Sequence, residues 1–79
     1  MGGDKVSYEQ IDEITAALET ELASHHPNEA PWLVFMAPIK PLWGGGFDML
    51  GQKHDTLDSA VAAQRRWVLY MIEQLEATP

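Results

Sequence analysis

The sequence predicts an α+β fold: a small two-layer domain of order α-β-β-α in which two helices pack on an antiparallel hairpin. Three observations predict it. Apolar residues recur with helical spacing near both ends of the chain, an apolar run between Pro31 and Pro38 has the length of a strand, and three consecutive glycines follow that run. At 79 residues the chain is expected to form one domain, 1–79, with a disordered leader over residues 1–5.

Residues 8–24 predict the first helix. Ser7 has the side chain of an N-cap, Gln10 completes a capping box, and Pro27 ends the helix. The expected inward stripe is Tyr8, Ile11, Ile14 or Thr15, Leu18 and Leu22. The expected outward face is acidic and contains no base: Glu9, Asp12, Glu13, Glu19 and Glu21.

The segment 32–37 predicts the first strand, because the flanking prolines leave six apolar residues, which are too few for a typical helix. Strand alternation places Trp32, Val34 and Met36 on one face, and Leu33, Phe35 and Ala37 on the other. Both faces are apolar, so one of them is expected to need cover from outside the hairpin. Residues 40–46 predict a loop, and residues 47–53 a second, antiparallel strand.

The segment 56–76 predicts the longest helix. Its apolar stripe recurs at spacings of three, four and seven residues: Leu57, Val61, Val68, Met71 and Leu75. Thr56 has the hydroxyl of a helix N-cap. The run 67–72 is apolar on every side, so part of it, Leu69 above all, is expected to need a second surface as cover.

These elements hold more apolar surface than a chain of this size is expected to bury, since small domains bury only about 60% of their unfolded surface. An isolated hairpin is also marginally stable. We therefore expect a homodimer, formed edge to edge through two hairpins, or by pressing two sheets or two final helices together, unless another protein covers the surplus.

The charge balance excludes some partners. Twelve acids and five bases give a formal net charge of -7, which disfavours direct binding of nucleic acid or of an anionic membrane surface. We see no apolar run near the roughly 20 residues of a membrane span, and no secretory signal pattern at the N-terminus. The expected location is the cytoplasm.

The residue types that carry chemistry point to no enzyme, no cofactor and no metal. The sequence has no cysteine. His25 and His26 would join His54 and Asp55 in a metal site if the end of the first helix approached the start of the last, but loop histidines in solvent are the simpler interpretation. The glycines at 44–46 lack the Lys-Ser/Thr sequence of a phosphate loop and predict a flexible hairpin loop.

The acidic face of the first helix is the most directional charge feature. Its simplest interpretation is a solvated face that keeps the protein soluble. The functional alternative is recognition of a basic surface, extending to mimicry of nucleic-acid phosphates. Trp32 and Trp67 lie on predicted core faces and are expected to be packing residues. Trp43 lies in the glycine loop, and it is either folded back over the core or serves as an anchor for a partner.

We therefore predict a small acidic, non-enzymatic protein-binding module, an adaptor or an inhibitor that occludes a partner surface, of the kind that phages and mobile elements encode against a host or its defences. The predicted partner-binding residues are Glu9, Asp12, Glu13, Glu19, Phe35, Trp43 and Leu69. One alternative is a structural homo-oligomer or a minor subunit of a larger assembly. Another is a small enzyme or ligand binder whose site forms between protomers, with His54, Asp55 and His25 as its residues.

Overall fold

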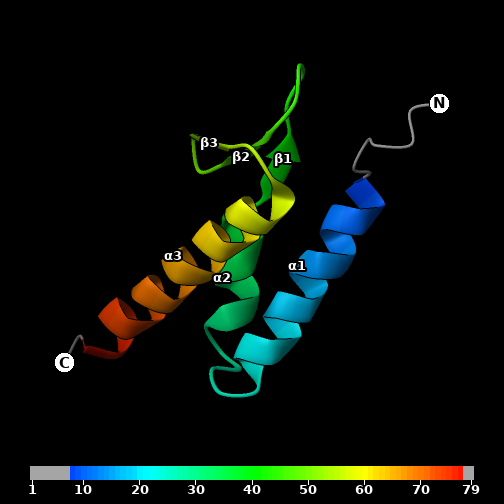
Figure 1. Ribbon diagram of the computed structural model, residues 1–79. Coiled ribbons are helices and arrows are strands. Elements are labelled where there is room, and N and C mark those ends of the chain that lie inside the picture. The colour runs from blue at the N-terminus through cyan, green and yellow to red at the C-terminus, as the bar shows by residue number, and fades with distance from the viewer. Residues whose placement is uncertain (1–7, 78–79) are drawn as a thin grey trace.

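The computed structural model describes residues 8–77 and confirms the α+β class, with more elements than the sequence predicts (Figure 1). The elements are α1 (Tyr8–Ala23), α2 (Ala30–Met36), β1 (Ile39–Pro41), β2 (Phe47–Met49), β3 (Gln52–His54) and α3 (Leu57–Ala77). The order over these residues is thus α-α-β-β-β-α. The predicted leader and the Ser7 cap lie outside the described residues.

Helix α1 begins and ends close to the predicted positions. Its buried side chains are Ile11, Leu18 and Leu22, which lie on the predicted inward stripe. Tyr8 is exposed, so the prediction that it faces inward is wrong. The helix ends before Pro27, where the amide of His26 donates to the carbonyl of Leu22 over 2.8 Å.

The predicted strand at 32–37 is wrong, because this segment forms helix α2. Pro31 lies in the first helical turn, where its missing N–H has no partner to lose, and Pro38 follows the last turn. Ala30, Leu33 and Val34 are buried on one side of the helix, followed by buried Ala37. This spacing of three, four and seven is helical, but the equally apolar residues between these positions hide it.

The sheet has three antiparallel strands in the order β1-β2-β3, each three residues long. The predicted second strand at 47–53 is therefore two strands, divided by a turn at Leu50 and Gly51. Both turn residues have positive φ angles, of 53° and 83°. Asp48 pairs with Lys40 on one side and with Lys53 on the other.

Helix α3 spans the predicted segment and begins at the predicted cap, because the hydroxyl of Thr56 accepts a hydrogen bond of 3.1 Å from the amide of Ser59. In Figure 1, α1 and α3 diverge from the sheet end of the domain and α2 runs between them. One core cluster joins α3 to the sheet and to Ile11, and a second joins all three helices. Trp67 packs against both clusters and is half-buried.

Candidate protein-binding surface

The acidic face of α1 is present as a row of carboxylates. Glu9, Asp12 and Glu13 are exposed, and Glu19 is half-buried. Asp12 and Glu19 are two helical turns apart and lie on the same side of the helix. Within residues 8–77, no ion pair involves these four side chains. Their charges are therefore available to a partner.

Glu21 differs from the rest of the acidic face. Arg65 of α3 donates to Glu21 Oε1 from Nη1 over 3.0 Å and to Oε2 from Nη2. These hydrogen bonds hold the pKa of Glu21 below its ordinary value and raise the pKa of Arg65. The base comes from a helix 44 positions away, so the sequence pattern of the first helix alone does not reveal the pair.

The exposed side of α2 is apolar. Phe35 is 82% exposed, Met36 57% and Trp32 46%, while Leu33 and Val34 on the other side are buried. Phe35 is thus exposed in this chain, and its cover by a second surface stays a prediction. Strand alternation separates Phe35 from Trp32 and Met36, whereas the helix brings all three together, so the expectation that Trp32 is a core residue is wrong.

Trp43 lies at the tip of the β1–β2 loop and is fully exposed, so it does not fold back over the core. The carbonyl of Leu42 accepts a hydrogen bond from the amide of Gly45 over 3.2 Å, which places Trp43 at the second position of a four-residue turn. Gly44 follows with a φ of +84°, as the third position of a type II turn requires.

Leu69 is 38% exposed and lies one turn after Arg65, along the edge of α3 that faces α1. The exposed side of α2 points away from the helices that bury Leu33 and Val34. Phe35 and Leu69 therefore lie on different sides of the helices, and the structure does not bring them into one surface.

The histidines lie at opposite ends of α3. His26 donates from Nδ1 to Glu76 Oε2 over 3.0 Å, whereas a hydrogen bond of 2.9 Å joins His54 Nδ1 to Ser59 Oγ. Ser59 and Glu76 are separated by roughly 25 Å of helix. The connector after α1 thus contacts the end of the last helix through His26 and not its start. Residues 8–77 hold no group of three His, Asp or Glu side chains placed for a metal ion.

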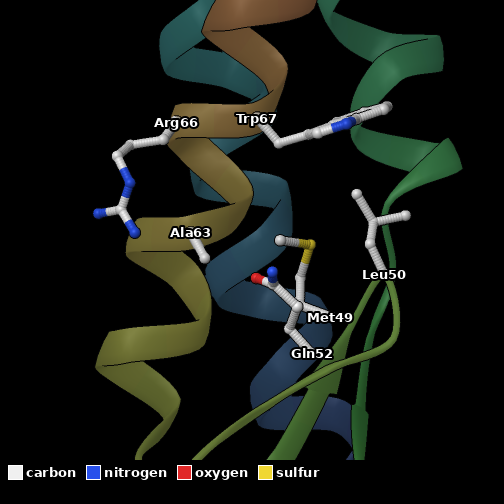
Figure 2. Close-up of a pocket in the computed structure, with 6 residues that line it drawn as sticks. All are labelled: Met49, Leu50, Gln52, Ala63, Arg66 and Trp67. Atoms are coloured by element: carbon white, nitrogen blue, oxygen red, sulfur yellow. The ribbon is translucent and has the colours of Figure 1, made fainter.

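A groove that the sequence does not reveal lies between the β2–β3 turn and α3 (Figure 2). Its volume is about 370 Å³, and its lining residues are Met49, Leu50, Gln52, Ala63, Arg66 and Trp67. In Figure 2 the indole of Trp67 and the side chain of Leu50 lie on one side, the guanidinium of Arg66 on the other, and the amide of Gln52 between them. One side of the groove is therefore apolar and the other polar.

Comparisons with known proteins find no matching family model, no similar curated protein and no similar solved structure. Of the helices within residues 8–77, none is both long enough and apolar enough to cross a membrane.

Proposed function

We propose that the protein is a binding module that acts by occluding a surface of another protein, as an adaptor or an inhibitor without chemistry of its own. The observation that supports this most directly is the exposed side of α2, where Trp32, Phe35 and Met36 lie together on two turns of helix. Scattered exposed apolar residues are common, but adjacent large ones typically mark an interaction site.

The partner we propose has an apolar contact area bordered by basic residues. Aromatic and methionine side chains are enriched at protein interfaces, so the α2 side chains would supply affinity. The unpaired carboxylates of α1, a helix that packs directly on α2, would attract the basic border and speed association. A cytoplasmic nucleic-acid-binding protein of the host is one such partner, in which case the acidic row imitates phosphates.

Affinity capture with matched variants tests this proposal. The double reversal Asp12→Lys/Glu13→Lys and the single variant Phe35→Ser should each lose a partner that the wild type retains at about 50 mM salt and releases at about 500 mM, where charge attraction is screened. The control is Asp55→Lys/Glu73→Lys, which makes the same charge change at exposed positions outside α1.

The control should keep the partner. If the two double reversals weaken capture equally, net charge alone is responsible and the acidic row is not a recognition element. If Phe35→Ser captures as well as the wild type, α2 is not the contact surface.

A homodimer is the second candidate, and the composition of α2 favours it. Its sequence, APWLVFM, contains no charged residue, so two copies would meet through α2 without burying a charged side chain of that helix. Sedimentation equilibrium would then give a dimer for the wild type and a monomer for Phe35→Ser. A monomeric wild type at about 100 μM would exclude this candidate.

A further inference from the structure

The groove between the β2–β3 turn and α3 contains a backbone conformation that is unfavourable for its residue. Leu50 has a φ of 53° and Gly51 a φ of 83°, the geometry of a two-residue type I′ hairpin turn. Asparagine or glycine is typical at the first position of that turn. Other residues are strained in the left-handed conformation, because they have a Cβ atom but no short polar side chain to form a local hydrogen bond. A leucine there is an outlier.

Packing of Leu50 into the core does not account for this strain. Leu50 is 45% exposed and belongs to neither buried core cluster. Its side chain lines the groove from the β2–β3 turn and, in Figure 2, lies on the same side as the indole of Trp67. Strained residues that persist without contributing to the core typically belong to binding sites, so we take the conformation as a sign that Leu50 contacts a ligand.

The opposite side of the groove carries a cation. Among residues 8–77, Arg66 makes no ion pair, although acids outnumber bases in this chain. Its neighbour Arg65 shows the contrast, because that guanidinium is occupied by Glu21. Guanidinium groups bind carboxylates through two parallel N–H donors, and the amide of Gln52 adds another donor nearby.

We propose that this groove binds the C-terminal residue of a polypeptide partner, with a large aliphatic side chain against Leu50, Met49 and Trp67 and its carboxylate at Arg66 and Gln52. The volume of about 370 Å³ lies at the lower end of the range for ligand pockets, which suits one residue better than a long acyl chain. None of the lining residues belongs to α1 or α2. A negative result at this groove would therefore leave the proposed function of α1 and α2 intact. A negative result for α1 and α2 would likewise leave the groove proposal intact.

Fluorescence of Trp67 tests the proposal in the full chain. The variant Trp32→Phe/Trp43→Phe leaves Trp67 as the single tryptophan, since the sequence has three. The probes are acetyl-Ala-Leu with a free carboxylate, its C-terminal amide, and octanoate. We expect saturable binding of the acid and at least five-fold weaker binding of the amide and of octanoate.

Two further variants separate the parts of the site. Arg66→Gln should reduce binding of the acid to the level of the amide, while the control Arg65→Gln should keep the preference. Leu50→Asn should abolish binding and raise the melting temperature by about 3–8 °C, because asparagine suits the left-handed region.

Each of three results would overturn the proposal. Equal binding of the acid and the amide would show that the groove does not recognise the carboxylate. Octanoate binding as tight as that of the peptide would exclude specificity for a polypeptide C-terminus. A lower melting temperature for Leu50→Asn would show that the leucine stabilises the fold and is not held there for a ligand.

Discussion

The side-chain amide of Gln64, which is completely buried in the middle of α3, donates a 2.8 Å hydrogen bond to the carbonyl oxygen of Ala37 at the end of α2. Helices leave their last carbonyls without backbone partners, and a buried carbonyl needs another donor. Gln64 supplies that donor, and in doing so it connects α3 to the point where the chain leaves α2 and enters the sheet.

Replacing Gln64 should therefore lower the free energy of unfolding more than replacing a typical glutamine, which lies on the surface. Gln64→Met keeps the length of the side chain but leaves the Ala37 carbonyl unpaired, which should lower the free energy of unfolding by about 1–3 kcal/mol. Gln64→Glu should cost more at pH 7 than at pH 4, since the charged form is the expensive one to bury. Urea denaturation at the two pH values checks both. If Gln64→Met leaves the free energy of unfolding unchanged, the hydrogen bond does not contribute to stability.

The helical conformation of α2 predicts different stability losses for two neighbouring substitutions, whereas a strand would predict similar ones. Leu33 is buried and Phe35 is exposed, although the two would share one face of a strand. Leu33→Ala should lower the free energy of unfolding by about 2–5 kcal/mol, as for other buried leucines. Phe35→Ala should change it by about 0.5 kcal/mol or less. Similar losses from both variants in thermal unfolding would contradict the helix.

The ion pair between Glu21 and Arg65 predicts a pH-dependent contribution to stability. The pKa of Glu21 is lowered in the folded state from an ordinary value of 4.5, so the contribution is fully present above that value and is lost as the pH falls through the lower folded-state pKa. The melting temperature of Glu21→Gln should fall below that of the wild type near neutral pH, and the two should converge once the pH falls below the folded-state pKa of Glu21.

Glu13→Gln is the control for this pair, because it removes the same charge from an exposed position of the same helix that makes no ion pair within residues 8–77. It should change the melting temperature little at any pH. If Glu21→Gln and Glu13→Gln show the same pH profile, the pair does not stabilise the fold.

The glycines of the β1–β2 loop are not equivalent. Gly44 and Gly46 both have positive φ angles, of +84° and +87°, but a Cβ atom at Gly46 would lie 2.9 Å from the carbonyl oxygen of His54, whereas open space surrounds Gly44. Gly44→Ala should cost about 1–2 kcal/mol for the backbone angle alone. Gly46→Ala should cost more, because β2 and β3 must also shift, and chemical denaturation of the two variants should show the difference.

Periodicity predicts the bounds of the two long helices well, but the predicted inward stripe of α3 is largely wrong. Only Val68 of that stripe is buried, Leu57, Val61 and Met71 are half-buried, and Leu75 is exposed. The buried side of α3 consists of Ala60, Ala63, Gln64, Val68 and Ile72.

Periodicity fails at α2, where Trp32 and Phe35 are as apolar as the buried Leu33. The division of the second strand is also hidden, since the usual sign of a two-residue hairpin turn is Asn-Gly and the chain has Leu-Gly.

The candidate surface divides in the same way. A loop tryptophan can either fold back over the core or project from it, so the sequence leaves the exposure of Trp43 open. The surplus apolar surface around Phe35 is predictable. The groove is not, because Leu50 and Trp67 come from a turn and a helix that only the tertiary fold brings together. The pairing of Glu21 with Arg65 is hidden for the same reason.

The shortness of the outer strands has a consequence for how copies of this protein would meet. β1 and β3 each span three residues, and β1 ends at Pro41, which has no N–H to donate. A neighbouring chain therefore finds almost no backbone to extend into a continuous ladder, so edge-to-edge growth toward fibrils is blocked at both margins. Crowded solutions of this protein should cluster through side chains and disperse again on dilution.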